Sequence, residues 1–360
     1  MISILVSGKE SLKFLNGFLE IISPEETPLN VIVDTFDFFD FYDMRVYPQL
    51  TNVLLLFMNQ LNETRWTGRN KDSLEISNFL QNVDDKYPSL EEIHEVGDLY
   101  LAPNIFINHR LKNNHKMSTC INELSKNITA AVIIPLSNDE LKLEFNFKDL
   151  STIEGFNEQK SSINALFDAF ESITLSNEAK AALLKSELIL LPKPSVVSIL
   201  SFLKILKEVL KDAVGQIIFV SPITEKGLDS TSLQAFQEMR LPESSIGISK
   251  ILRGLVDVYV IDTIEEPHKN RITRYGMKVV SHPLTLDTIK NQLDVVEFVL
   301  KLTPFRDVVE SFEYKTKKEV DSLKQGFKKL FGGLKRITSR PSPNNEAYDE
   351  EEDDDEDTEE

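Results

Sequence analysis

Seven short apolar runs constrain the fold of this chain more than any other feature. They are rich in β-branched residues and occupy residues 2–6, 31–33, 131–134, 188–191, 217–220, 258–261 and 278–280. Because the runs are apolar on both faces, we expect both faces to be buried, which is typical of strands in a parallel sheet. Amphipathic stretches with helical spacing separate the runs, among them residues 12–22, 162–173, 198–210 and 285–302. The alternation predicts an α/β fold: a doubly wound, mostly parallel sheet with helices on both faces.

The order of the elements also predicts where a ligand would bind. In open sheets of this class, ligands bind in the crevice beyond the carboxyl ends of the strands. The segments that directly follow a predicted strand are residues 7–11, 34–43, 135–140, 192–198, 221–227 and 262–267. We therefore expect the functional residues to come from these segments.

The C-terminal part of the chain differs from the rest in charge. Residues 346–360 hold 12 acids and no base, so the net charge of −18 falls to −6 for the first 345 residues. Residues 315–340 carry nine Lys or Arg and two acids, with apolar residues every three or four positions, which predicts a basic amphipathic helix. We expect three parts: an α/β domain over residues 1–302, a basic helical extension over 303–340, and a disordered acidic tail over 341–360.

The partner of the predicted basic helix is left open by the sequence. Its apolar stripe could pack on the protein's own body or on another protein, or it could lie on an anionic membrane surface. Contact with nucleic acid is a third alternative, although no specific nucleic-acid motif is present. The acidic tail would shield the lysines and weaken an external contact.

Several familiar classes of protein are excluded by composition and motif. No apolar run approaches the ~20 residues that span a bilayer, and the amino terminus lacks the pattern of a signal peptide. The single cysteine, Cys120, cannot form an internal disulfide, which predicts a reducing, cytoplasmic environment. A Walker A loop, a Gly-x-Ser-x-Gly elbow, a Rossmann glycine fingerprint and zinc-type His or Cys spacings are all absent.

Several segments together resemble one known family. They include SGKESLKFLNGF after the first strand, ETRWTGRNKDSL, EVGDLYLAPN, VIIPLSND, LILLPKPSVVSIL, RGLVDVYVID and YGMKVVSHPLTL. In order and spacing they are similar to the CofD family, the 2-phospho-L-lactate transferases that build the side chain of the deazaflavin coenzyme, from residue 1 to about 302. The resemblance implies a CofD-like, Rossmann-like fold and a site that binds a deazaflavin precursor or another phosphate-bearing small molecule. The ligand-binding residues it suggests are Ser7, Gly8, Trp66, Gly68, Asp98, Lys193 and Ser198.

The departures from the family pattern fall on its chemistry. Gln49 and Thr51 stand where the family has two Asp residues, one of which contacts the acceptor or its magnesium. Glu10 lies in the turn that should cradle a phosphate and would repel it. Of the family's Asn-Thr-Gly-Asp-Asp turn, only Asp37 keeps an acid in its family position.

Three candidate site features have an alternative, purely structural interpretation. Acids at positions 34, 37, 40 and 43 could hold Mg²⁺, with Asp37 and Asp43 as the candidate ligands. Alternatively, this segment is a turn and a half-exposed helix whose acids face solvent. Trp66 could stack on the acceptor or simply pack in the core. Lys193 could meet a phosphate or be an ordinary surface lysine.

Two classes of function follow. In the first, the chain is a pseudoenzyme that keeps the fold and a ligand cleft and acts as a ligand-binding, regulatory or interaction protein; the residues at positions 49 and 51 favour it. The related gluconeogenesis-factor family shows that this fold can serve regulation. In the second, the chain is an active Mg²⁺-dependent transferase that moves a phospholactyl-type group onto a hydroxyl of the deazaflavin precursor. The sequence assigns no catalytic residue, so it does not decide whether the chain is an enzyme.

Overall fold

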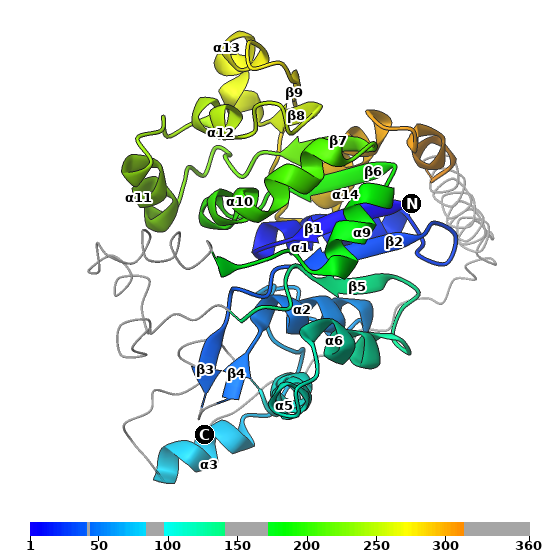
Figure 1. Ribbon diagram of the computed structural model, residues 1–360, viewed down its shortest axis with the longest axis vertical. Helices are drawn as coiled ribbons and strands as arrows, with labels where there is room; N and C mark the ends of the chain where they lie inside the picture. The colour runs from blue at the N-terminus through cyan, green and yellow to red at the C-terminus, as the bar shows by residue number, and fades with distance from the viewer. Residues whose placement is uncertain (42–43, 84–96, 141–171, 313–360) are drawn as a thin grey trace, which may run out of the picture. The chain divides into compact units, whose positions relative to one another are not determined.

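A seven-stranded parallel sheet forms the centre of the molecule (Figure 1). The computed structural model describes residues 1–41, 44–83, 97–140 and 172–312. The strand order is β5-β2-β1-β6-β7-β8-β9, and each neighbouring pair is parallel. The bounds are β1 (Ile2–Val6), β2 (Leu29–Val33), β5 (Val132–Pro135), β6 (Leu188–Pro192), β7 (Gln216–Val220), β8 (Val258–Ile261) and β9 (Lys278–Ser281). These are the seven predicted strands.

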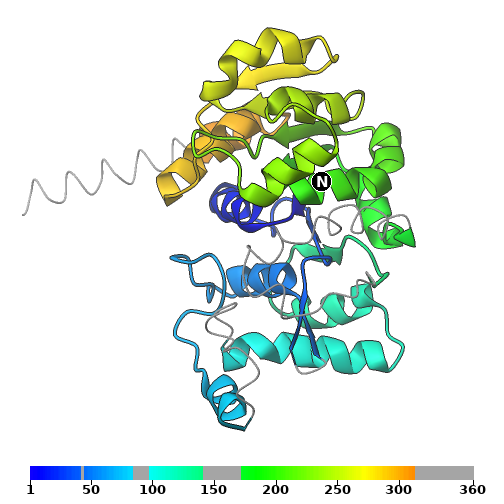
Figure 2. The same cartoon turned by 90° about the vertical axis from the view of Figure 1, so that its left-hand side faces the viewer.

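Helices cover both faces of the sheet, which confirms the predicted fold class (Figures 1 and 2). On one face, α9 (Asn177–Lys185) and α10 (Val196–Asp212) pack into a continuous apolar core with alternate strand residues such as Leu5 and Leu191. On the other face, α1 (Lys9–Ile21) and α14 (Ile289–Lys301) lie against each other. The remaining helices are α2 (Pro48–Phe57), α3 (Glu75–Val83), α5 (Asp98–Lys112), α6 (Met117–Ser125), α11 (Ser230–Glu238), α12 (Ser245–Ile251), the 3₁₀ helix η3 (Thr263–His268) and α13 (Lys269–Thr273).

A β-hairpin replaces the helix that was one interpretation of residues 34–43. Strands β3 (Phe39–Phe41) and β4 (Met44–Val46) pair antiparallel, and Arg45 Nε donates to Asp40 Oδ1 across the hairpin at 3.1 Å. Phe39 is buried while Asp40 is exposed, so this stretch has the two-residue period of a strand. The helix expectation is therefore wrong for this segment.

Other expectations fall partly or wholly outside the described residues. Nearly all of the helix expected over residues 162–173, the basic helix and the acidic tail lie there. By its internal contacts the chain divides into two units, Met1–Val309 and Glu310–Glu360. Within the described part, none of the helices is both long and apolar enough to cross a membrane.

The point where the chain reverses direction across the sheet lies between β1 and β6. From β1 the chain proceeds outward through β2 to β5, and it then returns to the other side of β1 to build β6, β7, β8 and β9. The first turns of α1 and α10 follow these two central strands directly. This switch point is where a doubly wound fold leaves room for a ligand.

Candidate functional site

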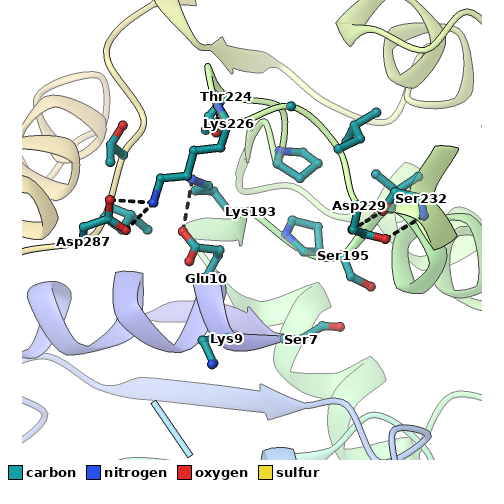
Figure 3. Close-up of a pocket in the computed structure, with 18 residues that line it drawn as sticks. Ser7, Lys9, Glu10, Lys193, Ser195, Thr224, Lys226, Asp229, Ser232 and Asp287 are labelled. Carbon is teal, nitrogen blue, oxygen red and sulfur yellow. Dashed lines mark hydrogen bonds and ion pairs between the residues drawn. The ribbon is translucent and has the colours of Figure 1, made fainter. Parts of the chain in front are cut away.

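A cavity of about 280 Å³ opens at the switch point (Figure 3). Its walls come from residues 7–10 after β1, residues 193–196 after β6, the loop between β7 and α11, and residues 285–287 before α14. Three of the segments that were expected to carry the site therefore meet here. Most of the residues that line the cavity are polar or charged, with serine, threonine, lysine and carboxylate side chains among them.

Gly8 shapes the wall that follows β1. Its φ of 84° lies in the left-handed region, which a residue with a side chain adopts only at a cost. Three residues later, Ser11 Oγ accepts a hydrogen bond from Ser7 N at 2.7 Å and donates to Gly8 O at 2.9 Å. These bonds hold the turn tightly closed where it enters α1, so that Ser7 and Gly8 both reach the cavity.

Lys193 is a buried cation on the opposite wall. Only 3% of its surface is exposed, and its φ of 45° is unusual for a residue other than glycine. The ammonium Nζ donates to Leu284 O at 2.6 Å and lies 3.3 Å from Glu10 Oε2. Burial lowers the pKa of Lys193, and the Glu10 carboxylate opposes that change. The residue is thus a built part of the cavity and not an ordinary surface lysine.

A chain of ion pairs continues from Lys193 around the cavity. Lys13 Nζ lies 2.6 Å from Glu10 Oε1 and 3.6 Å from Asp287 Oδ1. Lys226 Nζ lies 2.6 Å from Asp287 Oδ2, which joins the loop after β7 to the loop before α14. Five charged side chains from four parts of the sequence therefore form one connected network beside the cavity.

Asp34, one of the four acids that the sequence analysis considered for Mg²⁺ but did not choose as a ligand, is a functional candidate in the structure. It follows β2, is 3% exposed, and accepts hydrogen bonds from Ser7 Oγ at 3.0 Å and from Phe36 N at 2.8 Å. Burial, and then the nearby charge of Asp37, raise the pKa of Asp34 to about 7. A carboxyl group with that pKa can exchange a proton near neutral pH. Its position at the end of a central strand was the available signal.

Asp37 and Gln49 lie together beyond the same strand. Gln49 Nε2 donates to Asp37 Oδ2 at 3.2 Å, whereas the buried Gln49 Oε1 has no hydrogen-bond partner in the part of the chain that the structure describes. Thr51 is fully buried and accepts from Asn104 Nδ2 at 3.0 Å. Asp43, the other predicted metal ligand, lies outside the described residues. Among the described residues, no three His, Cys, Asp or Glu side chains are grouped to hold a metal.

The remaining candidates divide between the cavity and other places. Ser7, Gly8 and Lys193 line the cavity, and Ser198 Oγ lies 3.5 Å from Asp34 Oδ2. The other three, Trp66, Gly68 and Asp98, do not line it. Trp66 is 7% exposed in a loop, Gly68 N donates to Asn52 Oδ1 at 3.3 Å, and Asp98 contacts the first turn of α3.

Comparison with known sequences gives a family and several relatives that share one description. The sequence model of the family described as 2-phospho-L-lactate transferase CofD matches residues 30–301. The chain is 25% identical to the 2-phospho-L-lactate transferase of Methanocaldococcus jannaschii over 319 residues, covering 83% of this chain and 98% of that protein. It is 29% identical to the protein of that name in a strain of Methanococcus maripaludis, with 83% and 97% covered. A third relative, from Methanosarcina acetivorans, is 22% identical, with 83% and 98% covered.

Proposed function

Because the chain belongs to the 2-phospho-L-lactate transferase CofD family, we propose that it transfers a 2-phospho-L-lactate-type group onto the hydroxyl of an acceptor of the deazaflavin-precursor class. The phosphate-linked donor lies in the switch-point cavity. The observation that carries this proposal is the pairing of Ser7 with Asp34: a cavity-lining hydroxyl bonded at 3.0 Å to a carboxyl group whose pKa is raised to about 7.

This pair gives the acceptor hydroxyl a route for its proton. When the acceptor oxygen attacks the phosphorus, its proton passes to Ser7 Oγ, and Ser7 gives its own proton to Asp34 Oδ2. The bond from phosphorus to the leaving group breaks, and the leaving group carries away the electron pair. A base whose pKa lies near the operating pH is effective in such a transfer, and groups of this kind contribute roughly 10²–10⁴-fold.

The phosphate charge is met by lysines on the other walls. Lys193 presents a buried ammonium group and Lys226 an exposed one, and both line the cavity. Since phosphoryl transfer depends on positioning and on charge neutralisation, these two cations would orient the donor and stabilise the developing charge.

We infer that a magnesium ion would bind beside Asp37, with fewer protein ligands than the family pattern has. Asp37 would supply one carboxylate, and the buried Oε1 of Gln49, which has no hydrogen-bond partner among the described residues, would supply a neutral oxygen of the type that Mg²⁺ accepts. These two residues would hold the ion, and water and substrate phosphate would complete its coordination. The ion would supply additional neutralisation of phosphate charge.

The residues at positions 49 and 51 favour a second candidate function. Gln49 and Thr51 are uncharged and both are buried. They stand where the family pattern has two Asp residues, so two carboxylates of that pattern are replaced here by neutral groups. A chain with a weaker metal site could bind the same ligands without turning them over and act in regulation. The two candidates differ in one measurable property, which is product formation.

The test is an assay of the full-length protein with an activated phospholactyl donor, a deazaflavin precursor with a free hydroxyl and Mg²⁺, with the product identified by its mass. We expect product, and we expect Asp34→Asn to reduce the rate by roughly 10²-fold or more, as for loss of a general base. The control is Asp212→Asn, which changes an exposed carboxylate at the far end of α10 and leaves the rate unchanged. Ligand binding without product in the unmodified protein would support the second candidate instead.

A further inference from the structure

Glu10 occupies an unusual place for a carboxylate in a site that should bind phosphate. It lies in the first turn of α1, lines the cavity and has a side chain that is 39% exposed. Figure 3 shows it directed at Lys193 across the space between two walls. Its two oxygens are shared between two cations: Oε1 lies 2.6 Å from Lys13 Nζ, and Oε2 lies 3.3 Å from Lys193 Nζ.

The Glu10 carboxylate is placed as the anionic group of a bound ligand would be, because it lies between two ammonium groups. Lys193 is 3% exposed, and within the described residues its ammonium group forms an ion pair with Glu10 and donates to the carbonyl of Leu284. The charge of Asp262 also acts on it, more weakly than that of Glu10. Burial would raise the pKa of Glu10, but Lys193 and Lys13 outweigh it and hold that pKa below its usual value. The carboxylate therefore stays charged at neutral pH and neutralises a cation that is otherwise costly to bury.

Glu10 also affects the net charge of the cavity lining. In the described lining, three cations and three anions are present: Lys9, Lys193 and Lys226 against Glu10, Asp229 and Asp287. Asp229 is already engaged, because it caps α11 through Ser232 N at 2.8 Å and Ser232 Oγ at 2.7 Å. Among these lining side chains the charges balance with Glu10 in place, and the lining carries one net positive charge with Glu10 turned away.

We propose that Glu10 is a tethered competitor for the ligand's anionic group: phosphate or diphosphate displaces it from Lys193, so that the cavity selects groups with two or more negative charges over simple carboxylates. This selectivity deepens the proposed function, on which it rests for the identity of the ligand class.

The selection follows from an exchange of charges. A carboxylate ligand that displaced Glu10 would exchange one carboxylate for another at the same lysines and would also have to be immobilised from solution. A phosphate group brings more charge and three acceptor oxygens, which can engage Lys193 and Lys226 together. Because Glu10 is held by its own backbone, it competes at the high effective concentration of an intramolecular group. Only the more highly charged ligand overcomes that competition.

The experiment measures binding of inorganic pyrophosphate and of acetate to the full-length protein by isothermal titration calorimetry. Pyrophosphate should bind the unmodified protein, and Glu10→Gln should bind it about tenfold more tightly, the effect of removing one competing charged hydrogen bond. Acetate should bind measurably only to Glu10→Gln. The matched control is Glu20→Gln, which removes the same charge from an exposed position on the same helix and should change neither affinity.

Two further variants keep the test decisive. Glu10→Asp retains the charge but shortens the side chain, so pyrophosphate should bind with an affinity between those of the unmodified protein and Glu10→Gln. Lys193→Met should weaken pyrophosphate binding, whether or not Glu10 is also replaced. Equal or weaker pyrophosphate binding by a folded Glu10→Gln protein would overturn the proposal.

The outcome is independent of turnover. Tighter pyrophosphate binding by Glu10→Gln in a protein that makes no product would leave this inference standing and remove the transferase proposal. Product formation with unchanged pyrophosphate affinity in Glu10→Gln would do the reverse.

Discussion

Asp72 and Asp98 cap each other's helices. Asp72 accepts hydrogen bonds from Leu99 N at 3.1 Å and Tyr100 N at 2.9 Å in the first turn of α5, which Asp98 begins. Asp98 in turn accepts from Glu75 N at 3.1 Å and Ile76 N at 3.0 Å in the first turn of α3. A Cβ on Gly97 would lie 2.3 Å from the Asp72 side chain, so glycine is needed where the two caps meet. This reciprocal capping is a structural reason for the Gly97-Asp98 pair, and no contact with a ligand is needed to explain it.

Replacing the Asp98 carboxylate should therefore cost stability. Asp98→Ala leaves three donors at the start of α3 without their acceptor and should lower the free energy of unfolding by about 1 kcal/mol, within the range for helix caps. Urea denaturation measures this difference. Glu63→Gln, which alters an exposed acid outside the two helix caps, serves as the control and should leave stability unchanged. A ligand role for Asp98 would gain support if Asp98→Ala kept full stability but lost ligand affinity.

The raised pKa of Asp34 should make stability depend on pH. Because the folded pKa of about 7 lies above the unfolded value, Asp34 binds its proton more tightly in the folded state. The free energy of unfolding therefore falls as pH rises from the unfolded pKa to the folded pKa. Asp34→Asn removes this dependence. Its unfolding free energy relative to the unmodified protein should therefore rise with pH, by at most about 1.4 kcal/mol per unit. Urea unfolding at about pH 5 and about pH 8 tests this, with Asp212→Asn expected to show no such trend.

A carboxylate restored at position 49 should strengthen metal binding. In Gln49→Asp, a second negative charge lies near Asp37, so the metal-free variant should be less stable than the unmodified protein because like charges repel. Mg²⁺ should then raise the melting temperature of the variant more than that of the unmodified protein. Gln49→Asn and added K⁺ at equal ionic strength are the controls. Equal Mg²⁺ shifts in both proteins would argue against a metal site at this position.

Trp66 should report on its surroundings without any label. It is the only tryptophan in the chain and is 7% exposed, so its emission should be blue-shifted and poorly quenched by acrylamide. If the acceptor binds beside it, a deazaflavin precursor should alter that emission on titration. Binding detected by calorimetry with no change in Trp66 emission would place the acceptor elsewhere.

The strands were predictable because a run with apolar residues on both faces indicates a strand that is buried on both faces. Residues 188–191 are apolar at every position, residues 2–6 at every position except Ser3, and in the structure these strands are buried on both faces. The hairpin was harder, because Phe39 and Phe41 alternate with Asp40 for only three residues and the surrounding acids recur every three. So short an alternation is outweighed by a competing period.

The sequence predicted which segments contribute to the site, but not the contacts between residues of different segments. Chain order placed Ser7 and Lys193 near the same sheet edge, and both line the cavity. The contact between Glu10 and Lys193, however, joins residues far apart in sequence, and no local pattern predicts that the two charges will neutralise each other. The pKa of Asp34 depends on burial by residues from several loops, which the sequence of residues 34–43 does not contain.

The strand order has a consequence for synthesis of the chain on the ribosome. Because β1 pairs with β6, the first strand to be translated waits for residues beyond 188 before its second edge is covered. The cavity also needs residues 285–287, which emerge later still. A nascent chain can therefore assemble β1, β2 and β5 early, but the cavity is complete only after nearly the whole sheet has been made. Ligand cannot assist the early steps of folding, and it can stabilise only the finished domain.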